Sequence, residues 1–348
     1  MAYTTIDDPE LYFQTKLYTG NGGTQSITLD GSENMQPDWT WIKKRNGAAD
    51  SSIMDVVRGV RKSLRSNSTA TDYTESSGFS SFDSDGFSFD GTAYNHVNRS
   101  SDTFVAWNWK AGGSASSNSD GDITSSVSAN TTSGFSIVSY TGTGSVATIG
   151  HGLGVAPKLI IVKTRSYSSQ AWPVDVRAVD GILYLNETGA KGSYGNSSPF
   201  PTTAPTASVF SVGSPENTNA SSATYIAYCF AEKQGYSKIG SYTGGSDPFV
   251  YLGFKPAWIM FKNSSASENW RIIDNKRDTD NPAAQHLYPN LANAEGSGTS
   301  YNDFVDFLSN GFKIRSGSGE IDGSGNTIIF LAFAESPFVN SNGIPNNA

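Results

Sequence analysis

The chain contains three copies of one sequence unit. Each copy contains the tripeptide Tyr-Thr-Gly, at Tyr18, Tyr140 and Tyr242. Each copy closes on an apolar run that ends in an aromatic residue, at Trp109, Phe230 and Phe333. Because both ends of the unit recur with nearly the same spacing, whole units were copied, and chance recurrence of one tripeptide is excluded.

The repeat divides the chain into units 1–112, 134–233 and 234–348, the last with a C-terminal tail. The stretch 113–133 has almost no apolar residues, which predicts a flexible linker between the first and second units. Only the four residues from Glu232 to Gly235 join the second and third units. We therefore expect these two units to pack as a rigid pair.

Each unit of about a hundred residues alternates short apolar runs with turn signals. The matching segments SFDSDGF and DFLSNGF each place a polar turn and a glycine between two phenylalanines, which predicts a tight hairpin or strand entry. Charged residues make up only 16% of the chain, which disfavours long solvated helices. Short helices are expected at 52–64 and 301–308. The fold class predicted is all-β, with three tandem β-sandwich units (jelly-roll or lectin-like) and little helix.

A lysine followed twelve residues later by an aspartate is the sharpest motif of the repeat. The pairs are Lys43 and Asp55, Lys163 and Asp175, and Lys262 and Asp274, and an arginine follows each aspartate by two or three residues. One interpretation is a catalytic or ligand-binding pair, and the other is a structural contact across neighbouring strand ends. Three copies of a fold device fit better than three active sites in one chain. The structural interpretation predicts that the two side chains of each pair lie close together.

The seven tryptophans suit either a core or stacking on sugars, because an indole buries a large flat area. Most of them lie within apolar strand runs and are expected in the core. Trp172 and Trp270 follow polar loops instead. These two are the candidate surface contact residues.

The residues that carry chemistry predict neither a cofactor nor a metal site. The three histidines fall at non-equivalent places in the repeat, and the only cysteine, Cys229, lies in an apolar strand run. A carboxylate pair for glycoside cleavage stays open, because its separation is a property of the tertiary structure. No catalytic residues are assigned, and the chain is expected not to be an enzyme.

The net charge of −8 argues against a nucleic-acid backbone as the main partner. The chain has no apolar run near 18 residues, so membrane insertion is not expected. The start MAYTTIDDPELYF lacks the basic and apolar stretches of a secretory signal.

Several segments carry a resemblance to a known family. DWTWIKKRN in the first unit, GVAPKLIIVKTR in the second and VYLGFKPAWIMFKNS in the third resemble a family of marine bacteriophage virion proteins, described as virion structural or tail-fibre-like. The resemblance covers nearly the whole chain. It implies an all-β protein of the virion, assembled in the host cytoplasm with other virion proteins as partners, and it brings no catalytic residues with it.

We therefore expect a tail-associated structural protein (fibre, tip or appendage) that attaches to the tail or to the host surface through its loops. A homo-oligomer is expected, with a trimer favoured by analogy with fibres, although the sequence lacks coiled-coil heptads. Three alternatives stay open. They are a capsid decoration protein, a receptor-recognition module that binds a host-surface glycan, and a polysaccharide depolymerase.

Overall fold

The protein is all-β, as predicted. The computed structural model describes residues 3–90, 96–245, 247–296, 304–316 and 318–345. The helices within these ranges are a single turn long: η1 (Pro9–Leu11), α1 (Glu216–Asn219) and α3 (Gly319–Asp322). No helix of the described ranges is both long enough and apolar enough to cross a membrane.

The first unit has a six-stranded sheet of order β1-β9-β3-β4-β5-β6 and a three-stranded sheet of order β2-β8-β7. The strands of the long sheet are β1 (Phe13–Thr19), β3 (Trp39–Lys44), β4 (Ser52–Asp55), β5 (Lys62–Arg65), β6 (Tyr73–Thr74) and β9 (Thr103–Trp109). Those of the short sheet are β2 (Gln25–Thr28), β7 (Gly78–Asp83) and β8 (Gly86–Asp90).

The second unit has a seven-stranded sheet of order β10-β11-β12-β18-β14-β15-β16 and a two-stranded sheet of β13 and β17. The long sheet contains β10 (Ser116–Asn118), β11 (Ser125–Asn130), β12 (Phe135–Thr141), β14 (Leu159–Thr164), β15 (Pro173–Val176), β16 (Gly181–Tyr184) and β18 (Thr224–Phe230). The short sheet pairs β13 (Ala147–Gly150) with β17 (Val209–Val212).

The third unit has a four-stranded sheet of order β19-β25-β21-β22 and a three-stranded sheet of order β20-β24-β23. The long sheet contains β19 (Ser237–Thr243), β21 (Phe254–Asn263), β22 (Trp270–Asp274) and β25 (Thr327–Pro337). The short sheet contains β20 (Phe249–Tyr251), β23 (Phe304–Leu308) and β24 (Gly311–Ser316). In each unit the last strand of the repeat lies between the first strand and the strand that carries the repeat lysine. The three sets are β1-β9-β3, β12-β18-β14 and β19-β25-β21.

Both segments expected to be helical form strands. The range 52–64 contains β4 and most of β5, because burial of Ile53 and Leu64 in the core overrides local helix propensity. The range 301–308 contains β23, and its first three residues lie outside the described residues. The two predicted hairpins are present, with Asp83 opposite Gly86 and Leu308 opposite Gly311. These glycines are required by close backbone approach, since an added Cβ would lie 2.0 Å from the Ile27 carbonyl oxygen in the first hairpin.

The prediction of a flexible linker over 113–133 is wrong. This stretch contains β10 and β11, which extend the long sheet of the second unit beyond β12. Its few apolar side chains, among them Ile123 and Val127, are buried in that unit's own core. The stretch is polar because outer strands keep much of their surface in water.

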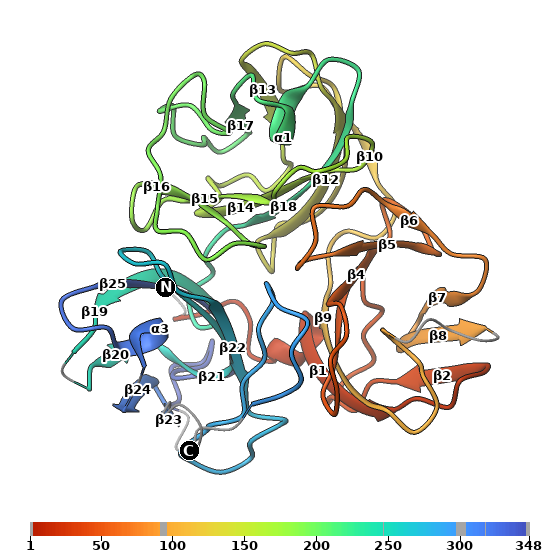
Figure 1. The fold of residues 1–348 in the computed structure, drawn as a ribbon. Coiled ribbons are helices and arrows are strands. Elements are labelled where there is room, and N and C mark those ends of the chain that lie inside the picture. The colour runs from red at the N-terminus through yellow and green to blue at the C-terminus, as the bar shows by residue number, and fades with distance from the viewer. Residues whose placement is uncertain (1–2, 91–95, 246, 297–303, 317, 346–348) are drawn as a thin grey trace.

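The three units enclose a common apolar core. Figure 1 shows three lobes around a centre, with the second unit at the top, the third at the left and the first at the right. The inner faces of the three long sheets meet in this core. Ring centroids are 5.9 Å apart between Trp39 and Phe230, 6.0 Å between Phe230 and Phe333, and 5.4 Å between Trp109 and Trp258. The second and third units, which were expected to pack as a pair, are thus two members of a ring of three in which each unit contacts both others.

The outer face of each long sheet packs on the short sheet of the same unit, over a separate apolar cluster. The tyrosines of the repeated Tyr-Thr-Gly belong to these clusters or pack against them. Their hydroxyls donate to the carbonyl oxygens of Val97, Thr218 and Ile321, at 2.5, 2.7 and 2.5 Å. Each tyrosine thereby ties the first strand of its unit to the segment that precedes the last strand.

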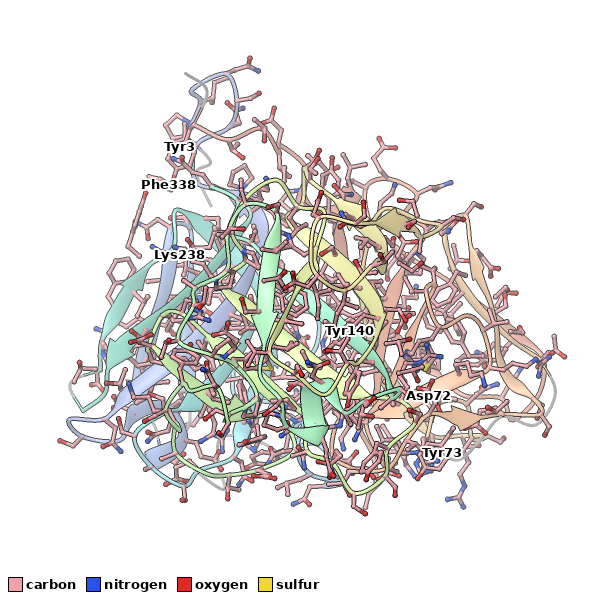
Figure 2. The ribbon with its side chains drawn as sticks, turned by 90° about the horizontal axis from the view of Figure 1, so that it is seen from above. Tyr3, Asp72, Tyr73, Tyr140, Lys238 and Phe338 are labelled. Carbon is pink, nitrogen blue, oxygen red and sulfur yellow. The ribbon has the colours of Figure 1, made fainter. Side chains whose placement is uncertain are left out.

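The two terminal segments meet on the third unit. The Tyr3 hydroxyl donates to the Gly253 carbonyl oxygen, and the Thr4 hydroxyl donates to that of Gln234. The backbone N–H of Ser341 donates to Asp7. Figure 2 shows Tyr3 and Phe338 at the base of a projection that stands out from the body of the protein. The start of the first unit therefore crosses to the third unit and closes the ring.

Candidate binding cleft and the contacts between the units

The repeat lysines join neighbouring units. They lie near the C-terminal ends of β3, β14 and β21, and each donates to one carbonyl oxygen of another unit and to one or two of its own unit. The contacts to the other unit are Lys43 to Leu291 at 2.6 Å, Lys163 to Thr69 at 3.0 Å, and Lys262 to Thr188 at 3.0 Å. The first unit thus contacts the third, the second contacts the first, and the third contacts the second. Burial of each ammonium lowers its pKa from 10.5 to about 8.

The prediction that each lysine faces its aspartate is wrong. The register of the hairpin places Asp55 opposite Trp39, four residues before Lys43, which is a distance of about 13 Å along a strand. Each aspartate instead pairs with the arginine that follows it. These separations are 2.5 Å for Asp55–Arg58, 2.8 Å for Asp175–Arg177 and 2.6 Å for Asp274–Arg277.

Two of the three aspartates also accept a hydrogen bond from another unit. The Tyr228 hydroxyl donates to Asp55 at 2.8 Å, and the Trp107 indole N–H donates to Asp274 at 2.9 Å. Both donors sit two residues before the closing aromatic of their repeat, where the third unit has Leu331, which cannot donate. By the same pattern Asp175 would accept from the third unit, at the position of Leu331. It accepts instead from the Tyr194 hydroxyl of its own unit, at 2.6 Å.

A shift of register explains this exception. Asp175 lies opposite Ile160, three residues before the repeat lysine, whereas Asp274 lies opposite Trp258, four residues before it. A slip of one residue turns a side chain to the other face of a sheet. Asp175 therefore points away from the central core, and burial raises the pKa of its carboxyl group.

The prediction that Trp172 and Trp270 are surface contacts is wrong. Their exposed fractions are 0% and 1%. Each indole N–H donates to a carbonyl oxygen of the neighbouring unit, Trp172 to Ser68 and Trp270 to Tyr184, at 2.9 Å in both cases. The polar loops before them led to the error, because these loops end where the chain enters the central core. The exposed aromatic side chains of the described residues are Tyr167, Phe249 and Tyr251.

A cleft of about 530 Å³ lies where the first unit meets the third. Residues of η1 and β1 form one wall, and residues of β21, β25 and the loop after β22 form the other. Within it, Glu335 pairs with Lys255 at 3.1 Å and accepts from Asn275 at 2.7 Å. Asp278 accepts two backbone N–H groups, at 2.5 Å each. These carboxylates hold the walls in place.

Thr15 lies on β1 in this cleft and is only 4% exposed. Within the described residues its hydroxyl oxygen has no hydrogen-bond partner. A buried hydroxyl without a partner costs free energy, so it calls for a structural or functional reason.

The repeat shows how unusual this threonine is. Three residues before the tyrosine of Tyr-Thr-Gly, the second and third units have Ile137 and Ile239, and both are part of the central core. Sequence reasoning missed Thr15. An alignment of the three copies on their tyrosines would have shown one hydroxyl at a position otherwise occupied by isoleucine.

The cysteine and histidine side chains that could act on a substrate include Cys229 and His151, and both are buried within the second unit. Cys229 is buried, and burial raises the pKa of its thiol, which keeps it protonated and unreactive. The His151 ring accepts the Leu153 N–H and contacts the Thr206 carbonyl oxygen. Among the described residues, no group of three histidine, cysteine or acidic side chains is placed to hold a metal ion.

Comparison with known proteins places the whole ring in one family. Residues 8–337 match the model of a family described as a domain of unknown function, DUF7483. No curated protein and no solved structure matches the chain.

Proposed function

We propose that this chain, which belongs to the DUF7483 family, is a bacteriophage virion structural protein of the tail (fibre, tip or appendage) that attaches to the tail or to the host surface. The resemblance of its repeat segments to marine phage virion proteins supports this proposal. The family match spans all three units, so the family shares the ring and not a single unit.

The observation that carries the proposal is the use of the repeated charged residues. Each repeat lysine binds a carbonyl oxygen of another unit, and each repeat aspartate pairs with a nearby arginine. Buried ionic groups of this kind favour one arrangement of the units over others. A rigid block with three similar lobes suits a part of an assembled particle better than an enzyme.

Other virion proteins and further copies of this chain are the partners in this proposal, with a homotrimer favoured. A trimer on a tail axis would present nine similar units, and the loops that face outward would carry the contacts. Native mass spectrometry of the purified chain should give a mass of three chains, and a monomer at micromolar concentration would contradict the trimer.

The test is to locate the chain in purified particles. Quantitative mass spectrometry should find it at tens of copies per particle or fewer, and gold-labelled antibodies should mark the tail in electron micrographs. Hundreds of copies over the shell would favour the alternative of a capsid decoration protein. Absence from purified particles would overturn the proposal.

A further inference from the structure

We propose that copies of this chain associate head to tail, with the outer face of the third unit's short sheet packed on the equivalent face of the first unit of the next copy. This inference rests on the homo-oligomer of the proposed function and names the two surfaces that would build it. Figure 1 shows both short sheets on the outer sides of the ring, away from the common core.

Two exposed aromatic rings mark the face on the third unit. Phe249 and Tyr251 are 49% and 47% exposed. Val250 between them packs on the apolar cluster under the sheet, so the two rings share the outward face of β20. Within the described residues β20 is an edge strand that pairs with β24 alone. Edge strands commonly carry charged side chains that block contact with other chains, whereas β20 carries two exposed rings.

Basic side chains lie beside these rings. Lys313 lies opposite Phe249 in the register of β24 and β20. Its neighbours in the sequence, Phe312 and Ile314, are buried, so Lys313 points outward. Arg315 follows on the same face of β24, and its side chain is 57% exposed. We call these four outward residues the aromatic face: Phe249, Tyr251, Lys313 and Arg315.

Tyr251 is held in place by its own unit and by the N-terminal segment. The Lys238 ammonium lies 5.5 Å from the centre of the Tyr251 ring and donates to the Tyr251 carbonyl oxygen at 2.7 Å. The Tyr3 hydroxyl lies 3.2 Å from the Tyr251 hydroxyl. Figure 2 shows Tyr3 and Lys238 on the same side of the protein. A ring that is already ordered loses little conformational entropy on binding, which suits it as an anchor of an interface.

The first unit has hydroxyl and acidic side chains at the same positions. The hairpin glycines fix the correspondence, since an added Cβ would lie 2.0 Å from the Ile27 carbonyl oxygen at Gly86 and 2.1 Å from the Val250 carbonyl oxygen at Gly311. Ile27 therefore corresponds to Val250. Counted from these residues, the four positions of the aromatic face are occupied in the first unit by Ser26, Thr28, Ser88 and Asp90.

Asp83 adds a further carboxylate to this face of the first unit. It lies opposite Gly86, where the third unit has Leu308. Its carboxylate accepts from the hydroxyls of Ser81 and Ser88, at 2.6 and 2.5 Å. These donors are neutral, so the negative charge of Asp83 stays available to a cation of another chain. We call Asp83 and the four residues named above it the hydroxyl face.

Charge selects the hydroxyl face of another copy as the partner of the aromatic face. Arg315 is paired with Asp306 of its own sheet, and Lys313 brings a further positive charge. Two aromatic faces in contact would bring like charges together, which disfavours a symmetric dimer. The hydroxyl face offers Asp83 to Lys313, and its small side chains leave room for the two rings.

The short sheet of the second unit is a weaker match. Its strands, β13 and β17, contain no acidic residue. Asp122 lies beside them, where it accepts from the backbone N–H and the hydroxyl of Thr148. A charge change at Asp122 therefore serves as a control for a charge change at Asp83.

A contact between two different faces continues from copy to copy until a ring closes or a filament grows. Each chain gives one aromatic face and one hydroxyl face, so a closed ring of three copies leaves neither face uncovered. The association is expected to weaken as salt is added, because it includes a pair of opposite charges at the surface.

The first experiment measures the mass of the full chain by sedimentation equilibrium over a range of concentrations. Phe249→Ser with Tyr251→Thr gives the third unit the residues of the first, so this double variant should fold. It should weaken association about a hundredfold, the effect of losing two aromatic anchors. Tyr167→Ser, which removes an exposed ring of the second unit, is the matched control and should leave the association unchanged.

The second experiment exchanges the charges of the two faces. Lys313→Asp and Asp83→Lys should each weaken association about tenfold, because each places like charges opposite one another. A chain that carries both changes should recover most of the affinity, since opposite charges meet again across the contact. Asp122→Lys should leave the association unchanged.

A wild-type chain that stays a monomer at every concentration would overturn the proposal. Binding of a sulfated oligosaccharide to that monomer, lost in the double aromatic variant, would then assign the aromatic face to a glycan. An oligomer unaffected by the aromatic variant, or no recovery in the exchanged chain, would also overturn the proposal. Weaker association of Asp122→Lys would do so in favour of the second unit.

The two proposals can fail separately. A chain that is found in particles and forms an oligomer insensitive to all these variants leaves the virion proposal standing and this inference wrong. A chain that associates through the two faces but is absent from purified particles gives the reverse result.

Discussion

The second unit differs from the first and third in how it uses the same aspartate. Asp55 and Asp274 face the central core and accept a hydrogen bond from another unit. Asp175, at the same distance from its lysine in the sequence, faces outward and accepts from Tyr194 of its own unit. Equal spacing along the chain has therefore produced two different environments.

The second unit differs from the other two both in the register of its Asp175 strand and in the donor that the neighbouring unit offers. The third unit has Leu331 where the others have Trp107 and Tyr228, so it offers no donor to the second unit. A core-facing Asp175 would lack that hydrogen bond, at a cost of about 1–3 kcal/mol. The shifted register avoids this cost, and it places Val174 and Val176 in the central core instead.

The largest expected effect comes from removing the core-facing carboxylates. Asp55→Asn or Asp274→Asn removes the nearer carboxylate from a fully buried arginine, and leaves Arg58 only its ion pair with Asp72 and Arg277 only its ion pair with Glu295. Each change should lower the free energy of unfolding by up to about 3–5 kcal/mol, the cost of leaving a buried charge without any partner. Asp175→Asn should cost less, about 1–3 kcal/mol, because the side chain of Arg177 is 16% exposed. Urea denaturation measures all three, and an equal loss for Asp175→Asn would contradict the comparison.

The repeat lysines make the same kind of contact in all three units, a hydrogen bond to a carbonyl oxygen of another unit. Their pKa in the folded protein is about 8, lowered by burial from 10.5 in the unfolded chain. Between these two values the unfolded chain binds more protons, so the free energy of unfolding should rise with pH from 8 to 10.5 and be lowest below 8. The rise should be on the order of 3 kcal/mol for each of the three lysines.

Lysine-selective ¹³C NMR should show three side chains that titrate near pH 8. Lys43→Met should remove about a third of the pH dependence of unfolding. A flat stability profile, or titration of all lysines near 10.5, would show that the three ammonium groups are not desolvated.

Removal of the Tyr228 hydroxyl, which donates to Asp55 from the second unit, should have a smaller effect on stability. Tyr228→Phe removes a hydrogen bond to a buried carboxylate and should cost about 1.5–3 kcal/mol in urea denaturation. The matched control is Tyr236→Phe, since the buried Tyr236 hydroxyl has no partner among the described residues. That control should change stability by less than about 0.5 kcal/mol or increase it. A similar loss for both variants would mean that the contact to Asp55 contributes nothing.

The smallest effect is expected at the cleft. Thr15→Ile gives the first unit the residue of the other two and should raise the free energy of unfolding by about 1 kcal/mol, because it removes an unsatisfied hydroxyl and adds apolar contact. Differential scanning calorimetry measures this gain. A destabilised variant would show that the strand at residue 15 is not equivalent to those at Ile137 and Ile239.

Much of the local structure could be predicted from the sequence. The three copies, the all-β class and the hairpins at Gly86 and Gly311 follow from periodicity and turn chemistry, which are local properties. The roles of Trp172 and Lys163 could not be predicted in this way, because their partners, Ser68 and Thr69, lie about a hundred residues away in another unit.

The amino-acid order by itself determined that this protein is built from three related β units, because copied residues and strand periodicity are written along the chain. Only the tertiary structure decided that the units share one core, that the stretch 113–133 contributes strands, and that Asp175 faces outward. The physical reason is that the face of a strand depends on pairing register, which changes with a slip of one residue and leaves no mark on spacing within the sequence.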